Sequence, residues 1–221
     1  MFILMLAIIP LSMSAQVYTN GMYFKSDQTF EVDKNIHETK TTNQSEIIIL
    51  SNTTRVSVEP NSHFMINSFF QEIYTNNIPS KAKFGSHSLA MSLNNGDVYV
   101  RFNGYDENSA CMISTSLADI QLKNGLFYIK TTESKTIIIS LEGTLVYFGG
   151  GNMEKTLSAG TAVIATPNEV KILEYKVSFS TQKIKDTAVV EMISDIKKRF
   201  DKTENVVFVD VYGKIVGIDM N

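Results

Sequence analysis

Three histidines, His37, His63 and His87, are the side chains of this sequence best suited to proton transfer or metal binding. None of them lies two or four residues from another histidine or from a cysteine, so the sequence lacks the spacing of a local zinc site. It also lacks the G-x-S-x-G pattern of a strained nucleophile turn. We therefore expect no catalytic residues, and a hydrolase with a dispersed site is the less favoured alternative.

Other segments have the composition of binding sites without the required pattern. Phe148–Asn152 is rich in glycine, but Glu154 stands before Lys155-Thr156 where a phosphate loop has glycine, so we expect a hairpin loop and no phosphate site. A calcium loop that began at Asp33 would end at Gln44, where glutamate is needed, so Asp33 is predicted to begin a turn. The single cysteine, Cys111, is predicted to be a small buried hydrophobe. No metal or cofactor is predicted.

Aromatic side chains could instead form a platform for sugar rings. On alternating strands about half of such residues face the core, and a tyrosine ring can be buried while its hydroxyl stays in water. A glycan-binding module is therefore a second alternative. The candidate residues are Phe69, Phe70, Tyr74, Tyr99, Tyr105, Tyr128 and Tyr147.

The elements that must position these residues are short alternating strands. They are rich in Val, Ile, Thr, Tyr and Phe, and turn residues separate them every 8–12 positions, which is typical of a β-sandwich, barrel or solenoid. Long helical periodicity is absent before about residue 184, which excludes strands that alternate with crossover helices. The predicted fold is all-β, a β-sandwich or β-solenoid-like domain of hairpin-linked strands. The clearest runs are Glu46–Ser51, Arg55–Glu59, Ser62–Asn67, Gly96–Phe102, Ser109–Thr115, Gly125–Lys130, Thr136–Leu141, Gly143–Phe148, Thr161–Ala165 and Glu169–Tyr175.

A weak internal repeat joins four of these runs. Each unit has a leucine, a short glycine-containing segment and a new alternating strand, at Leu93–Gly96, Leu122–Gly125, Leu141–Gly143 and Leu157–Gly160. Asn-Gly is the strongest short hairpin signal, because it tolerates positive φ. We interpret each unit as a strand end, a tight turn and a new strand. A solenoid and a chain of hairpins both fit this pattern.

The C-terminal part has a different pattern. Apolar residues within Ala188–Phe200 recur on one face of a helix, which we place at about residues 184–201. Val206–Val211 and Lys214–Ile218 then predict a hairpin. Helix and hairpin together have about 35 residues, too few to fold reliably alone. We expect residues 177–221 to pack on a β-domain formed by residues 16–176.

One segment carries a family resemblance. Thr115–Ile129 resembles the central motif of FecR-type domains, with Ser116 where the family has proline and Asn124-Gly125 where it has Gly-Thr. Ser45–Ile66, Gly96–Val100, Glu142–Val146 and Leu157–Gly160 resemble other parts of that family, so the resemblance spans about residues 21–166. It implies an all-β extracytoplasmic module that binds protein or glycan, with no catalytic residues.

Composition and the N-terminal residues bear on localisation. The chain has 221 residues, a net charge of −3 and a pI of about 5.7, which argues against a nucleic-acid binder. Met1–Leu11 is an uncharged apolar run, and the small residues of Ser12–Ala15 follow it. We interpret residues 1–15 as a signal peptide and expect a periplasmic or secreted chain. No other stretch is long and apolar enough for a transmembrane anchor.

These observations favour an exported, non-catalytic FecR-like β-module of the bacterial cell envelope. Its expected role is protein interaction or signal sensing, with another envelope protein, or a glycan, as the partner.

Overall fold

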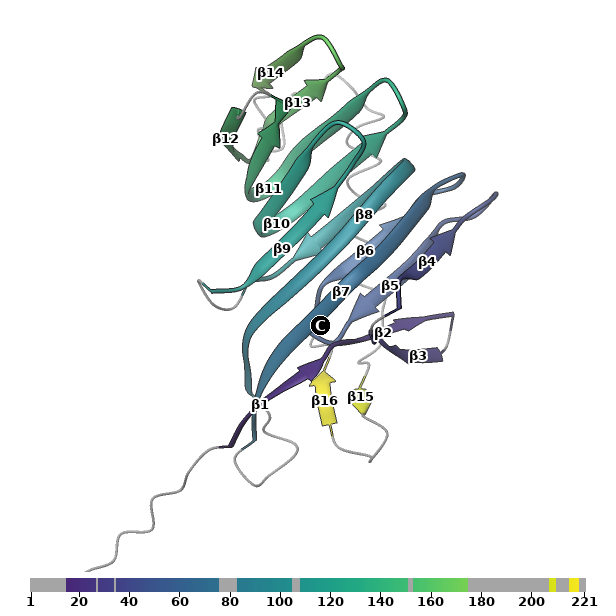
Figure 1. Cartoon of the computed structure of the whole chain (residues 1–221), viewed down its shortest axis with the longest axis vertical. Coiled ribbons are helices and arrows are strands. Elements are labelled where there is room, and N and C mark those ends of the chain that lie inside the picture. The colour runs from purple at the N-terminus through teal and green to yellow at the C-terminus, as the bar shows by residue number, and fades with distance from the viewer. Residues whose placement is uncertain are drawn as a thin grey trace, which may run out of the picture.

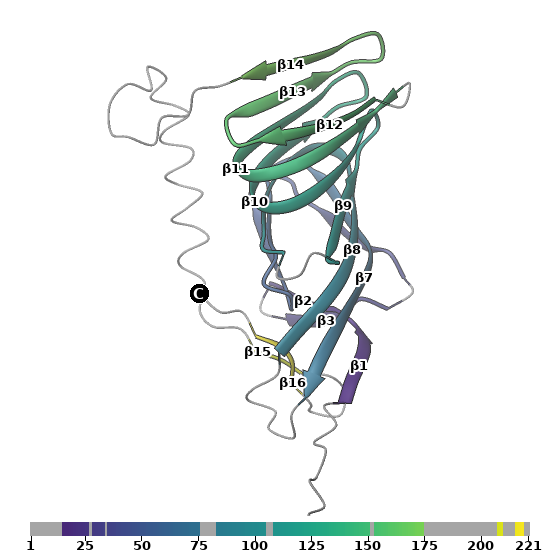
Figure 2. The ribbon, with the colours of Figure 1, turned by 90° about the vertical axis from the view of Figure 1, so that its left-hand side faces the viewer.

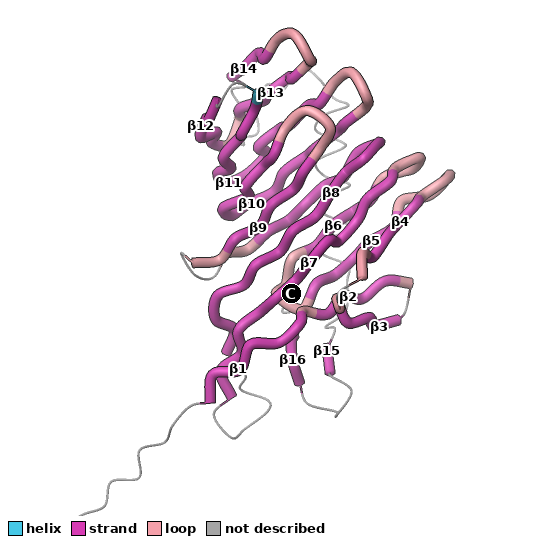
Figure 3. Tube along the Cα trace, viewed as in Figure 1, coloured by secondary structure: helices cyan, strands magenta, loops and turns pink. Residues whose placement is uncertain are grey.

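The computed structural model describes residues 15–26, 28–33, 35–75, 83–104, 108–150, 153–174, 207–209 and 215–218. Nearly all of these residues lie in strands or in the turns between them, as Figure 3 shows, which confirms the all-β prediction. The apolar residues 1–14, the predicted helix at 184–201 and the boundary between residues 176 and 177 lie outside the described residues.

Sixteen strands occur in the described residues, and Figure 1 labels them. Their bounds are β1 (Ala15–Asn20), β2 (Met22–Lys25), β3 (Gln28–Glu31), β4 (His37–Lys40), β5 (Glu46–Leu50), β6 (Arg55–Val58), β7 (His63–Thr75), β8 (Lys83–Phe102), β9 (Ala110–Ser114), β10 (Asp119–Thr131), β11 (Thr136–Gly149), β12 (Met153–Ser158), β13 (Thr161–Ala165), β14 (Val170–Glu174), β15 (Val207–Val209) and β16 (Ile215–Ile218).

Fourteen of the strands form one sheet. Its main path runs β14-β13-β11-β10-β9-β8-β6-β5-β2-β3, and β1, β4, β7 and β12 pair beside this path. The described pairs are antiparallel except β8 with β9, which is parallel. β15 and β16 pair with each other as a separate antiparallel hairpin, which confirms the hairpin predicted near the C-terminus.

Three long strands bend where the sequence suggested tight turns. Gly96, Gly125 and Gly143 have φ of +92°, +140° and +78°, yet they lie inside β8, β10 and β11. The interpretation of these repeats as turns between separate strands is therefore wrong at three of the four units, and only the unit at Gly160 is a turn, between β12 and β13. Positive φ at glycine permits a bulge inside a strand as readily as a hairpin turn, and the register of β10 with β11 shifts beside Gly125.

The bends fold the sheet into two layers. The first half of β8 pairs with β7 and β9, whereas its second half pairs with β6 and β10. β10 and β11 also change partners at their bends. We call the layer with β2, β3, β5, β6, β13 and β14 layer A, and the layer with β1, β4, β7, β9 and β12 layer B. Figure 2 shows the curved strands that join them.

One hydrophobic cluster fills the space between the layers. Val98 and Val100, on the second half of β8, and Phe127, after the bend of β10, contribute to it from layer A. Leu89 and Leu93, on the first half of β8, contribute from layer B. All five are 1% exposed or less. Burial of alternate residues on both layers explains why the alternating pattern in the sequence predicted the strands correctly.

Candidate functional site

The structure places the three histidines in different surroundings. His37 Nδ1 lies 3.2 Å from the Tyr23 hydroxyl, and His63 Nε2 lies 2.6 Å from a Glu38 carboxylate oxygen. His87 is buried, and its Nδ1 lies 3.1 Å from Ser109 Oγ. His63 begins β7, and His87 pairs opposite a residue eight positions further along that strand, a separation of about 26 Å.

The dispersed-site hydrolase required histidines close to one another. His37 lies opposite the buried Ile66 and faces the interior, whereas His63 lies opposite the exposed Lys40 on the outer face of layer B. In the part of the chain that the structure describes, no three His, Cys, Asp or Glu side chains lie close enough to hold a metal ion. The arrangement therefore gives the hydrolase alternative no geometric support.

The candidate sugar-stacking residues are mostly in the core. Phe69, Tyr99 and Tyr147 are buried, and Tyr128 donates its hydroxyl to Asp97 Oδ2 at 3.0 Å. Phe70 is 53% exposed. The side chain of Tyr74 and all of Tyr105 lie outside the description. Among the described candidates a single exposed ring remains, and a glycan platform needs at least two rings in line.

The other predicted residues form structural features. Asp33 Oδ1 accepts the Asn35 N–H at 2.8 Å, which confirms a turn there. Cys111 is fully buried, and burial raises the pKa of its thiol well above the usual value. Phe148 and Gly149 end β11 and pair with Glu154 and Met153 of the antiparallel strand β12, so the chain reverses direction after Gly149, in agreement with the predicted hairpin. In the FecR-like motif, Thr115 N–H donates to the Ala118 carbonyl at 2.8 Å and closes the turn between β9 and β10.

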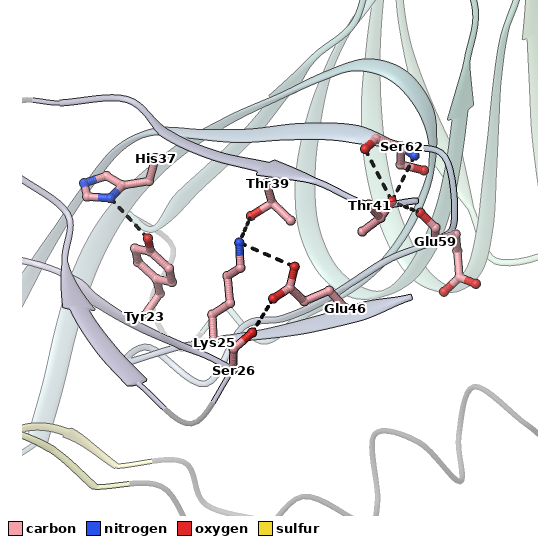
Figure 4. A network of polar contacts seen from close by, with 9 residues as sticks. All are labelled: Tyr23, Lys25, Ser26, His37, Thr39, Thr41, Glu46, Glu59 and Ser62. Carbon is pink, nitrogen blue, oxygen red and sulfur yellow. Dashed lines mark hydrogen bonds and ion pairs between the residues drawn. The ribbon is translucent and has the colours of Figure 1, made fainter. Parts of the chain in front are cut away.

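Polar contacts connect the two layers on the side of the sandwich formed by β2, β4 and β5. Lys25 Nζ on β2 donates to Thr39 Oγ1 on β4 at 3.0 Å and lies 3.4 Å from Glu46 Oε2 on β5 (Figure 4). The Tyr23–His37 hydrogen bond joins β2 to β4 in the same way (Figure 4). Because β2 and β5 belong to layer A and β4 to layer B, these contacts close that side of the sandwich.

The opposite side of the sandwich is bounded by β12 and β14. In the described residues β12 pairs only with β11, and β14 pairs only with β13. β12 ends at the corner formed by Ala159-Gly160, and the last residue of β14, Glu174, pairs with Thr161 beside this corner. Figure 2 shows β12, β13 and β14 together at the end of the sheet. Met153, Ile172 and Leu173 are 42%, 37% and 41% exposed along these strands. We call the space between β12 and β14 the edge groove.

Two cavities lie in the edge groove. The corner cavity has a volume of about 440 Å³ and is lined by the β12 residues Lys155 and Leu157 and the β14 residues Ile172 and Glu174. The mouth cavity has a volume of about 560 Å³. Its lining is Ser116, Leu117, Tyr147, Gly150, Met153, Thr166, Pro167, Asn168, Glu169 and Val170. Both cavities are depressions that open to solvent.

Tyr147 gives the mouth cavity an unusual polar group. The residue is 0% exposed, and its hydroxyl has no hydrogen-bond partner among the described residues. Gly149 leaves the room for this hydroxyl, because a Cβ at that position would collide with it. Burial raises the pKa of Tyr147, since the phenolate would lose its hydration. A buried hydroxyl without a partner costs free energy, so the Tyr147 hydroxyl destabilises the fold where it lies.

Sequence reasoning did not find the edge groove. Ile172 and Leu173 are consecutive apolar residues in a strand of otherwise alternating pattern, which was a signal that both faces of β14 are apolar. The isolated hydroxyl of Tyr147 had no sequence signal, because the lack of a partner depends on how the folded chain packs around it.

Comparison with known proteins identifies no family. No family model matches the chain, and no curated protein matches it. Among solved structures, a "putative anti-sigma factor" from Parabacteroides distasonis ATCC 8503 at 2.50 Å resolution aligns with a TM-score of 0.48 at 14% identity over 76% of both chains. A second structure with the same description, at 1.65 Å, aligns with a TM-score of 0.47 at 14% identity over 82% of both chains.

No helix of the described residues has the length and hydropathy to cross a membrane.

Proposed function

We propose that this chain is an exported, non-catalytic, FecR-like module of the bacterial cell envelope that acts by binding another protein. The observation that carries the proposal is the edge of β14, which has no strand partner in the described residues and exposes Ile172 and Leu173. Strand edges and exposed apolar residues are the features by which sheets recognise proteins.

Three further observations support this function. The resemblance to FecR-type domains implies an extracytoplasmic all-β module, and the fold is all-β. Thr115 and Ala118 of the resembling motif close a turn between two core strands, so the motif has a structural role. The histidines lie in separate surroundings, which favours a binding module over an enzyme.

Export and protein binding can be tested in the same cells. Alkaline phosphatase fused to the C-terminus should be active, because this reporter folds only after export. A photo-crosslinking amino acid in place of Leu173 should then capture a protein, whereas the same amino acid in place of Phe70, an exposed apolar residue on β7, should not. An inactive reporter would contradict export. Equal capture from both positions, or capture from neither, would contradict binding at β14.

A further inference from the structure

The backbone of β14 is oriented to accept another strand. Thr166 N–H donates to the Glu169 carbonyl at 2.8 Å, so these two residues form a hydrogen-bonded pair at the turn between β13 and β14. Hydrogen-bonded and non-hydrogen-bonded pairs alternate along an antiparallel ladder. The N–H and C=O groups of Val170, Ile172 and Glu174 therefore point away from β13, toward the edge without a described partner.

The same three residues line the two cavities. Val170 lies at the mouth cavity, and Ile172 and Glu174 lie at the corner cavity. Their side chains share the inner face of β14, because alternate residues of a strand point to one side. An added strand would place its own alternate side chains on this face, about 7 Å apart for each two residues. The cavities are thus placed to receive side chains of one extended segment.

The lining of the cavities indicates what kind of segment fits. Lys171 Nζ lies 3.0 Å from Glu169 Oε2, so the charge at the mouth is already neutralised. At the corner cavity Lys155 and Glu174 balance each other in sign. The groove therefore has no net charge that would attract a phosphate or an acidic or basic tail.

We propose that the edge groove binds an extended, uncharged peptide segment of the partner protein. The segment adds a strand to β14 and seats one apolar side chain in each cavity. This inference rests on the proposed function, because it specifies how the partner is held. Main-chain bonds at the edge would supply affinity, and the two cavities would supply specificity.

A second copy of this chain fits the groove less well. If two β14 strands paired symmetrically about Ile172, Glu174 of one copy would lie opposite Val170 of the other. That arrangement would bring a carboxylate to the mouth cavity beside Glu169 and the apolar Leu117 and Met153. A partner segment with apolar residues at these positions avoids that cost.

The test uses a phage-displayed library of random linear peptides selected on the full chain. Enriched peptides should carry apolar residues two or four positions apart. Ile172→Pro should weaken their binding about tenfold or more, because it removes an N–H at the free edge, and Ile172→Ala should weaken it less.

Control variants separate loss of pairing from loss of fold. Proline is tolerated where a strand N–H faces away from the sheet, so Ile172→Pro should keep the far-ultraviolet circular dichroism spectrum. Glu174→Pro is a second change of the same kind if the first does not fold. Leu173→Pro removes an N–H directed to β13 and should lower the melting temperature markedly.

Defined results would overturn the inference. It fails if no peptide is enriched, or if the enriched peptides bind Ile172→Pro and Glu174→Pro as tightly as the unchanged chain. It also fails if a photo-crosslinker at Leu173 reacts with a second copy or with residues after Glu174 of the same chain. Failure of the proposed function is distinguishable, because the export reporter and the capture of a protein in cells do not depend on the library.

Discussion

Replacing Tyr147 by phenylalanine should stabilise the protein in the absence of a ligand. The hydroxyl is buried and has no hydrogen-bond partner among the described residues, while the ring packs in the main core cluster. The change removes the hydroxyl and keeps the ring. A buried polar group without a partner costs about 1–3 kcal/mol, so we expect the free energy of unfolding to rise by about 1 kcal/mol.

Urea denaturation followed by circular dichroism measures this effect. For a chain of this size a slope of about 3 kcal/mol per molar urea converts the gain into a midpoint about 0.3 M higher. The slope itself should not change, because the variant exposes nearly the same surface on unfolding. A lower midpoint for Tyr147→Phe would refute the reasoning, since it would mean that the hydroxyl has a stabilising partner.

Tyr128→Phe is the matched control. Its hydroxyl donates to Asp97 Oδ2 at 3.0 Å, so the same chemical change removes a hydrogen bond that exists. We expect the free energy of unfolding to fall by about 1 kcal/mol. The two variants should therefore move in opposite directions. If both variants lower the free energy of unfolding equally, the presence or absence of a hydrogen-bond partner does not explain the effect of removing the hydroxyl.

Alkaline pH gives a second test of the same tyrosine. Burial raises the pKa of Tyr147 in the folded state, whereas in the unfolded state the group ionises near pH 10. The stability linked to this shift is present below about pH 10 and is lost as pH rises further, because the unfolded chain then releases the proton more easily. Tyr147→Phe should flatten the fall in unfolding free energy above pH 10. An unchanged slope would contradict the raised pKa.

Three further changes have definite expected outcomes. Gly125→Ala should destabilise the fold by at least about 2 kcal/mol, because φ is +140° and the new Cβ would collide with the Glu142 carbonyl oxygen. Gly150→Ala is the control: Gly150 has open space around it, so this change should alter the urea midpoint little. Cys111 should resist thiol reagents in the folded protein and react at once in denaturant, and rapid labelling of native protein would contradict its burial. Mass spectrometry of the exported chain should find Ala15 or Gln16 at its N-terminus, and an intact Met1 would contradict signal-peptide removal.

The strands were predictable because their signal is local. The alternating pattern on each side of the bend in β10 predicts which side chains are buried. The structure buries these side chains fully, at Ile120, Leu122, Phe127 and Ile129. The bend at Gly125 was not predictable as a bend. Its Asn-Gly pair is compatible with a hairpin turn or with a bulge inside a strand, and the choice depends on partner strands that continue past it.

The candidate site was less predictable than the fold. The edge groove lies between two strands that each have one described partner, because β12 pairs with β11 and β14 pairs with β13. This pairing is a property of the whole sheet and not of either segment. Sequence patterns show that a strand exists and which face is apolar. They do not show which strand lies at an edge, so Ile172 and Leu173 looked like ordinary core residues.

The two ends of the sheet differ in a way that bears on function. β3 is the other end of the main path, and its exposed Phe30 stacks on Tyr23 at 5.1 Å, while Lys25 connects the layers nearby. β14 instead exposes Ile172 and Leu173 next to two cavities. An exposed apolar strand edge promotes aggregation, and proteins usually protect such edges with charges or a covering segment. In the described residues both ends of the main path are strand edges with exposed apolar side chains, so the two cavities, and not the edge alone, distinguish β14 from β3.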